Sequence, residues 1–304
     1  MPRTIVLDCR RAMAGAAVAA LILVTLLQGA MAGSVRSWTF HSQVLGREVR
    51  TELFLPSDPT KAERPWAVLY LLHGLAGNER DWVDAGRIDE IMEPLIASGR
   101  IPPMLVVMPD GNDSWYIDDP RPSGFGPVFQ AFSQELVEAV DAAFPTAACR
   151  ELRLAGGLSM GGYGALLMGM DHPDRFGAVL GLSSAIFPPM PDDPAERARR
   201  HVFMFGALFS DPFDWQRFNR WNLFPRIPAL AATQERPAIW LDAGDDDFPS
   251  LLATNVDFFL QLRAAGVEAE LRVVDGAHNW EHWRPALSDA LTWAGRSLPT
   301  ACTS

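Results

Sequence analysis

Short apolar runs, separated by longer mixed segments, dominate the hydrophobic pattern of this chain. The apolar runs cover residues 66–72, 104–108, 176–182 and 238–241, and further strand-like segments cover 152–158 and 268–274. Mixed segments of helical length lie between them, at about 87–97, 128–143 and 250–265. Strands that are apolar along their whole length are typical of a parallel sheet with helices on both faces. The pattern therefore predicts an α/β fold with a mostly parallel central sheet, in one large domain.

Two segments depart from this alternation. Residues 34–55 alternate around a turn at Leu45-Gly46-Arg47, which predicts two antiparallel strands at the sheet edge. Residues 187–236 are rich in proline and aromatic side chains and show no clear strand. We expect them to form a cap or lid, inserted before the strand at 238–241. Its aromatic residues would either rim an apolar pocket or form the cap's own small core.

A glycine-rich junction joins the strand at 152–158 to a segment long enough for a helix. It reads Gly157-Leu158-Ser159-Met160-Gly161, the G-x-S-x-G pattern of a nucleophile elbow in its strand-to-helix context. So sharp a reversal strains the backbone at the serine and leaves no room for side chains at the two glycines. The junction predicts Ser159 as a nucleophile, with the Met160 amide directed at a developing oxyanion. A flexible turn would have the same local composition.

The strand at 66–72 ends in the sequence His73-Gly74-Leu75. In an enzyme built on a nucleophile elbow, the loop after this strand supplies the second oxyanion donor. We predict that the Leu75 amide has that role. His73 is expected to be structural, because a better placed histidine follows later in the chain.

Acidic residues and histidines follow the last two predicted strands. The first strand leads into Asp242, Asp245, Asp246 and Asp247, and the second leads into His278 and His282. The order Ser, Asp, His is that of an α/β-hydrolase triad, in which a histidine takes the serine proton and a carboxylate orients the imidazole. Asp247 is predicted as the acid because it lies well past its strand, with Asp246 and Asp245 as alternatives. His278 is favoured over His282, which begins the last helix.

Two aromatic residues, Trp115 and Tyr116, follow the strand at 104–108. Loops at the carboxyl ends of parallel strands line the active site in open α/β sheets. These rings are therefore candidates for a substrate-binding wall. Packing of their own loop would explain them equally well.

The first 32 residues have the features of an export signal. Arg10 and Arg11 precede an apolar run that leads to Ala30-Met31-Ala32, a small-x-small cleavage site. We expect residues 1–32 to be removed and the chain to be secreted or periplasmic, by the general or the twin-arginine route. An uncleaved anchor is the alternative, although the run is shorter than the ~20 residues of a spanning helix.

Charge and cysteine content exclude several classes of partner and cofactor. The formal net charge of −11 disfavours binding to nucleic acid or to anionic lipid surfaces. No Cys/His cluster has the spacing of metal ligands, so neither a metal nor another cofactor is expected. Cys149 and Cys302 would be retained after export, and they could pair or stay free.

Four motifs together resemble the esterase D family. They are His-Gly-Leu at 73–75, Met-Pro-Asp-Gly at 108–111 with Ser-Trp-Tyr at 114–116, Gly-Leu-Ser-Met-Gly-Gly-Tyr-Gly-Ala at 157–165 and Gly-Ala-His-Asn-Trp-Glu-His-Trp at 276–283. The family includes S-formylglutathione hydrolases, feruloyl and acetylxylan esterases, and antigen 85 mycolyltransferases. The resemblance implies an α/β-hydrolase with Ser159, Asp247 and His278 as triad and the Leu75 and Met160 amides as oxyanion hole. The export signal argues against a cytosolic S-formylglutathione hydrolase, and the long aromatic cap does not match any one member well enough for a substrate to follow.

The sequence thus predicts an exported serine carboxylesterase that works without a cofactor on a small-molecule or polysaccharide-linked ester. Acyl transfer to a sugar or lipid alcohol would use the same residues. A non-catalytic binding protein on this fold is the alternative outside the enzymes. The sequence leaves the oligomeric state open.

Overall fold

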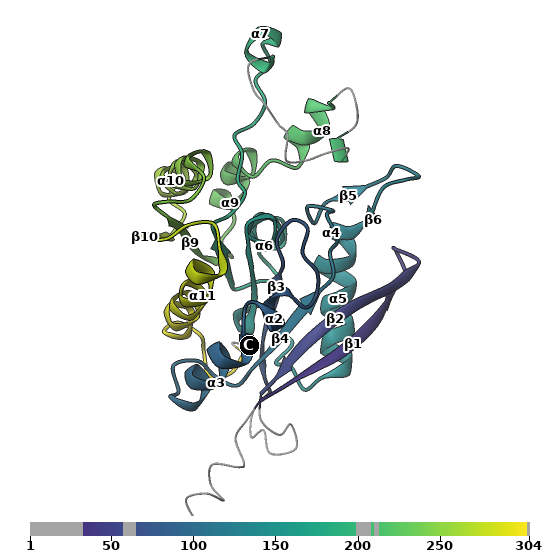
Figure 1. Ribbon diagram of the computed structural model, residues 1–304, viewed down its shortest axis with the longest axis vertical. Helices are drawn as coiled ribbons and strands as arrows, with labels where there is room; N and C mark the ends of the chain where they lie inside the picture. The colour runs from purple at the N-terminus through teal and green to yellow at the C-terminus, as the bar shows by residue number, and fades with distance from the viewer. Residues whose placement is uncertain (1–32, 57–64, 199–207, 210–212, 303–304) are drawn as a thin grey trace, which may run out of the picture.

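The centre of the fold is an eight-stranded sheet (Figure 1). The computed structural model describes residues 33–56, 65–198, 208–209 and 213–302, so the predicted signal segment and part of the predicted cap lie outside the described residues. The strands, in their order across the sheet, are β1 (Ser34–Ser42), β2 (Arg47–Leu55), β4 (Met104–Pro109), β3 (Ala67–Leu72), β7 (Arg153–Leu158), β8 (Ala178–Leu182), β9 (Ala238–Gly244) and β10 (Ala269–Val274).

Strand direction follows the sequence pattern. β1 pairs with β2, and β2 with β4, in antiparallel register, whereas every pair from β4 to β10 is parallel. The antiparallel strands are those of the alternating segment at 34–55, and the parallel ones are mainly the apolar runs. The predicted mostly parallel sheet is therefore confirmed.

Helices connect the strands and cover the sheet. They are α2 (Asp81–Asp84), α3 (Ile88–Ala97), α4 (Val128–Gln130), α5 (Leu136–Ala143), α6 (Met160–Asp171), α7 (Pro194–Arg197), α8 (Trp215–Arg220), α9 (Ile227–Ala232), α10 (Pro249–Ala264) and α11 (Trp280–Gly295). A π-helical turn, Ala131–Glu135, joins α4 to α5, so the helix expected at 128–143 is continuous with one wide turn. No helix in the described part of the chain has the length and hydropathy to cross a bilayer.

Alternate residues of β3 face two separate hydrophobic clusters. Tyr70 and Leu72 pack in a cluster with residues of α5, α6 and α10. Leu69 and Leu71 pack on the other side with residues of α3 and α11. Because each fully buried large apolar side chain stabilises a fold by about 2 kcal/mol, this double-sided packing holds the central strands firmly. The carboxyl ends of β7, β9 and β10 are fixed points from which the loops of the site extend.

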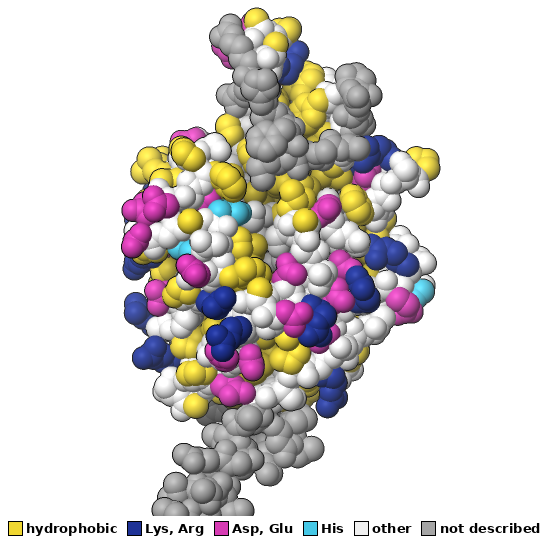
Figure 2. Space-filling view, in the orientation of Figure 1, with side chains coloured by type: hydrophobic (Ala, Val, Ile, Leu, Met, Phe, Trp, Pro, Cys, Tyr) yellow, Lys and Arg dark blue, Asp and Glu magenta, His cyan; other side chains and the backbone are white. Residues whose placement is uncertain are grey.

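The described part of the expected cap contains α7, α8 and α9 and no strand. Phe209, Phe213 and Phe218 contact one another there, with ring centroids 5.5–5.8 Å apart. These rings form a small core of the cap's own. The cap lies at the upper end of the molecule, and hydrophobic side chains gather around it (Figures 1 and 2). The expected aromatic residues Phe203 and Phe205 lie outside the described residues.

A buried arginine attaches the cap to the body of the protein. Arg217 of α8 places Nη2 3.2 Å from Oδ1 of buried Asp119 and donates a hydrogen bond of 2.9 Å to the Asp118 carbonyl. Both acceptors belong to β5 (Asp118–Asp119), which pairs with β6 (Gly126–Pro127) beside the main sheet. The cap helix is thus anchored by charge as well as by apolar contact.

A disulfide joins Cys149 to Cys302, with their Cα atoms 6.0 Å apart. Cys149 precedes β7, and Cys302 follows α11 near the end of the chain. Of the two possibilities that the sequence left open, the structure shows the paired state.

Candidate active site

The junction between β7 and α6 has the strained geometry of a nucleophile elbow. Ser159 has φ 54° and ψ −116°, a backbone conformation that residues other than glycine rarely adopt. A Cβ atom at Gly157 would lie 2.5 Å from the carbonyl of Gly161, and one at Gly161 would lie 2.4 Å from the Leu72 oxygen. Glycine is therefore required at both positions, as the steric argument from the sequence predicted.

Two backbone hydrogen bonds clamp the strained serine. The Ser159 amide donates to the Leu182 carbonyl at 2.9 Å, and the Ala185 amide donates to the Ser159 carbonyl at 2.9 Å. Both partners lie at the end of β8 and in the turn after it. The position of the serine is thus set by the neighbouring strand as well as by its own.

The structure brings Ser159, His278 and Asp247 into contact. His278 Nε2 lies 3.0 Å from Ser159 Oγ, and His278 Nδ1 lies 2.9 and 3.1 Å from the two carboxylate oxygens of Asp247. Ser159 follows β7, Asp247 follows β9 and His278 follows β10, so the carboxyl ends of three parallel strands of one sheet position the three groups, with β8 between β7 and β9. Such an arrangement can transfer the serine proton to the histidine while the carboxylate fixes the imidazole.

Burial and hydrogen bonding act in opposite directions on Asp247. Burial raises the pKa of its carboxyl group. The hydrogen bond and charge of His278 lower the pKa by more than burial raises it, so the pKa lies below its usual value. The Phe248 amide also donates to Oδ1, at 2.6 Å. Asp247 is therefore a stable anion and a fixed acceptor for His278.

The other candidate acids and the other histidine have different partners. Asp245 accepts a hydrogen bond from the Gly276 amide at 3.2 Å, and the Asp246 amide donates to the Gly276 carbonyl at 2.9 Å. Asp242 pairs with His282, away from Ser159. Asp245, Asp246 and Asp275 also bring carboxylate oxygens within 4.8 Å of one another, but all three are exposed. Nothing else at this surface indicates a cation, and we assign no metal to it.

Two unpaired amides fit the expected oxyanion donors. Within the described part of the chain, neither the Leu75 nor the Met160 amide donates a hydrogen bond to another protein group. Met160 is the first residue of α6, where helical amides have no partner within the helix. Leu75 is 39% exposed and lies one residue after Gly74, whose Cβ position is filled by the Leu158 side chain.

His73 is buried and joins two loops. The Gly111 amide donates to its Nε2 at 3.0 Å, so Nδ1 carries the proton and donates to the Gly74 carbonyl at 2.8 Å. The ring therefore has no free nitrogen to act as a base. It instead holds the Gly74-Leu75 backbone in place, which agrees with the structural role expected from the sequence.

Trp115 and Tyr116 lie in different surroundings. Tyr116 is 0% exposed and donates its hydroxyl to the His73 carbonyl at 3.0 Å, so its ring offers no surface to a substrate, and we do not carry it into the proposed site. Trp115 packs edge-on against Tyr163 of α6, one helical turn from Ser159, with centroids 5.8 Å apart. With cap residues it lines a cavity of about 10 Å³, to which none of Ser159, Asp247 and His278 contributes.

Sequence reasoning missed two aromatic residues beside His278. The Trp283 ring stands edge-on to the imidazole with centroids 4.9 Å apart, and Phe248, which is 55% exposed, lies 5.1 Å from it. The sequence held one clue to them, because Phe248 directly follows Asp247, the expected acid. An exposed ring beside the reacting groups is a candidate for contact with a substrate.

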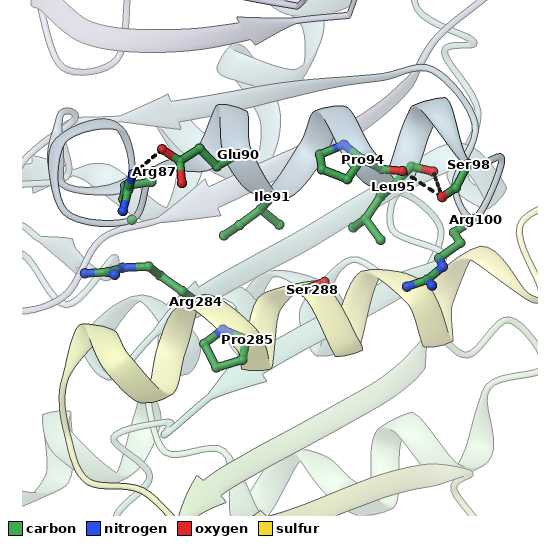
Figure 3. A pocket seen from close by; sticks show the side chains of 11 residues that line it. Arg87, Glu90, Ile91, Pro94, Leu95, Ser98, Arg100, Arg284, Pro285 and Ser288 are labelled. Carbon is green, nitrogen blue, oxygen red and sulfur yellow. Dashed lines mark hydrogen bonds and ion pairs between the residues drawn. The ribbon is translucent and has the colours of Figure 1, made fainter.

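A cavity of about 490 Å³ lies elsewhere, between α3 and α11 (Figure 3). Arg87, Arg100 and Arg284 line it together with apolar side chains of α3, and Arg284 points into it from α11. None of Ser159, Asp247 and His278 contributes to its lining. Cavity size alone therefore does not locate the candidate reactive groups.

Comparisons with known proteins identify the family of this chain. The family model Esterase matches residues 42–294. The chain belongs to the Esterase family. It is 30% identical over 275 residues to the acetyl esterase of Caldicellulosiruptor saccharolyticus, covering 84% of this chain and 96% of that protein. The chain is thus a carboxylic ester hydrolase, and the resemblance to the esterase D family is confirmed.

Solved esterases share the fold. A ferulic acid esterase superimposes with a TM-score of 0.71 at 28% identity, over 88% of this chain and 99% of that one. An S-formylglutathione hydrolase from Agrobacterium tumefaciens superimposes with a TM-score of 0.68 at 18% identity, over 88% and 96% of the two chains. At that identity the second likeness shows the fold alone, the α/β-hydrolase fold expected from the sequence.

Proposed function

We propose that this protein is an exported serine carboxylesterase that works through an acyl-enzyme. One observation carries the proposal, namely the continuous contact from Ser159 Oγ through the His278 imidazole to the Asp247 carboxylate. A serine hydroxyl alone is a weak nucleophile, and this contact supplies the base that activates it.

Each group has a defined part in the reaction. Asp247 holds the proton on His278 Nδ1, so the Nε2 lone pair faces Ser159 and takes the hydroxyl proton as Oγ attacks the ester carbonyl. The Leu75 and Met160 amides donate to the oxyanion that forms. His278 then gives its proton to the departing alcohol. Water repeats these steps on the acyl-enzyme and releases the acid.

The names of the relatives suggest the acyl group. One relative is an acetyl esterase and one structural neighbour is a ferulic acid esterase. The cavity beside Trp115 holds about 10 Å³, which is about the space of a single water molecule. Because Ser159, Asp247 and His278 do not line this cavity, its size does not set the acyl group, and we propose acetyl esters from the name of the relative of 30% identity.

Two features support export. The apolar run in residues 1–32 ends in a signal-type cleavage site. The Cys149–Cys302 disulfide is typical of proteins that fold in an oxidising compartment. We therefore propose a secreted or periplasmic enzyme, with residues 187–236 as its cap.

Hydrolysis of p-nitrophenyl esters, from acetate to a long acyl chain, tests the proposal. We expect the mature protein to favour acetate and Ser159→Ala to lose activity by a factor of about 10⁴ or more. Ser250→Ala removes an exposed hydroxyl from α10 and serves as the matched control. Equal activity in Ser159→Ala and Ser250→Ala would exclude Ser159 as the nucleophile.

A further inference from the structure

A second histidine–carboxylate pair lies behind the first. His282 Nε2 lies 3.0 Å from Asp242 Oδ2, and both side chains are almost completely buried. The two atoms lie within ion-pair distance, although within the described structure Nε2 makes no hydrogen bond of ordinary geometry. Asp242 lies on β9, five residues before Asp247, and His282 lies on α11, four residues after His278. The two pairs therefore join the same two segments of chain.

The ring of His282 rests on the backbone that leads to His278. A Cβ atom at Gly276 would lie 2.5 Å from His282 Nδ1 and 3.2 Å from its Cβ, so only glycine allows this contact. On its other side, Gly276 is bonded through its amide to the Asp245 side chain and through its carbonyl to the Asp246 amide. Gly276 is thus held between the acid loop and His282, two residues before His278.

Asp242 also connects to the strand that clamps the nucleophile. The Ser183 amide donates to the Asp242 carbonyl at 2.9 Å and lies 3.3 Å from its Oδ1. Ser183 has a φ of 42° and follows Leu182, the acceptor for the Ser159 amide. A shift of Asp242 would therefore reach both the histidine loop and the elbow.

We propose that His282 and Asp242 are positioning residues, which hold the His278 loop at its working distance from Ser159. The kinetic test of this positioning role rests on the proposed function, because it measures ester hydrolysis. Among the described residues His282 makes no hydrogen bond or ion pair with Ser159, and it acts through the backbone at Gly276.

The charges around His282 give the pair a pH dependence. Contact with the Asp242 carboxylate raises the pKa of His282 above its usual value, against the effect of burial. The charged groups that face it are Asp242 on β9, Asp245, Asp246 and Asp247 after β9, Arg272 on β10, Asp275 after β10, and Glu281 and Asp289 on α11. Because the pKa of His282 is higher in the folded protein than in the unfolded chain, the protonated pair stabilises the loop fully at pH values below the usual pKa of histidine. This stabilisation is lost as the pH rises through the pKa of His282 in the folded protein. Activity should consequently fall on the alkaline side.

Steady-state kinetics on p-nitrophenyl acetate from pH 5 to pH 10 test this role. We expect His282→Gln to lower kcat by about 10- to 100-fold with KM nearly unchanged, since a small misplacement of a catalytic group has effects of this size. It should also lack the alkaline decline, and in Asp242→Asn the decline should move to lower pH. His41→Gln is the matched control, because His41 pairs with Glu48 at 3.0 Å on the exposed surface. Unchanged kcat and an unchanged alkaline decline in folded His282→Gln would overturn the proposal.

Two further measurements do not depend on ester hydrolysis. Amide hydrogen exchange of residues 274–279 should be at least tenfold faster in His282→Gln than in the wild type and in His41→Gln, and equal rates would count against the pair. Should the variants not fold, NMR titration of wild-type His282 replaces them, and a midpoint above its usual pKa is expected. A wild-type protein that hydrolyses no ester would defeat the proposed function, while the exchange rates would still decide the positioning role.

Discussion

At the scale of single residues, the site depends on strain and on one unusual carboxyl group. Ser159 keeps a backbone conformation that costs about 1–3 kcal/mol, and the hydrogen bonds to Leu182 and Ala185 offset this cost. The lowered pKa of Asp247 means that its stabilising charge is present above its usual pKa and is lost only as the pH falls through the folded value. Asp247 therefore stays ionised at every pH above the usual pKa of an aspartate and remains a charged acceptor for His278.

Replacing Asp247 with asparagine tests this residue. We expect Asp247→Asn to lower kcat for p-nitrophenyl acetate by about 10⁴-fold, because the amide no longer fixes the imidazole proton on Nδ1. Asp246→Asn makes the same carboxylate-to-amide change at the exposed neighbouring residue and should keep most of the activity. A comparable loss in both variants would show that the loop as a whole is needed, and would remove the specific role of Asp247.

At the scale of elements, the cap is the part whose position depends least on the main sheet. Its rings pack on one another, and Arg217 ties α8 to β5 through a carbonyl and a buried carboxylate. Asp119 is also bound by Arg121, which donates to both of its carboxylate oxygens. Losing Arg217 would thus leave a buried acid with only one of its two cationic partners.

Urea unfolding of Arg217→Leu measures this anchor. We expect the free energy of unfolding to fall by about 2 kcal/mol, less than for a buried pair without a second cation. Arg220→Leu makes the same change on the exposed side of α8 and should stay within about 0.5 kcal/mol of the wild type. Equal losses in the two variants would show that Arg217 acts through its apolar stem or through helix propensity.

The elements of the main sheet could be predicted from sequence, and the cap's attachment could not. Continuous apolar runs such as that of β4 identify buried strands directly. The glycines around Ser159 indicate a turn that has no room for side chains. The order of Ser159, Asp247 and His278 along the chain pointed to three side chains that the structure brings into contact. The bond from Arg217 to β5 spans about a hundred residues and leaves no local pattern. For Tyr116 the sequence left a substrate wall and loop packing equally open, because only the packed fold shows which face of a loop is covered, and there the side chain is buried.

At the scale of the whole molecule, the disulfide closes a large part of the chain. Cys149 and Cys302 are 153 residues apart, and the enclosed segment contains Ser159, Asp247 and His278. A cross-link over so long a segment removes much of the freedom of the unfolded chain. It therefore stabilises the half of the protein that carries the site.

Removing the cross-link should make the protein less stable. We expect the double variant Cys149→Ser with Cys302→Ser to lose about 2–4 kcal/mol in the free energy of unfolding by guanidinium. Adding a reductant to the wild type should produce a similar loss and should leave the double variant unchanged. A wild-type midpoint that does not respond to reductant would mean that the bond contributes nothing to stability.

The same bond has a mechanical consequence. A pulling force applied at the C-terminal end passes through Cys302 to Cys149 and enters the sheet at the start of β7. It then bypasses α11 and the loop that holds His278. After reduction the force would instead peel α11 away from the sheet and draw His278 off Ser159. An oxidised molecule immobilised by its C-terminus should therefore keep its reactive groups aligned under tension, whereas a reduced one should lose that alignment first.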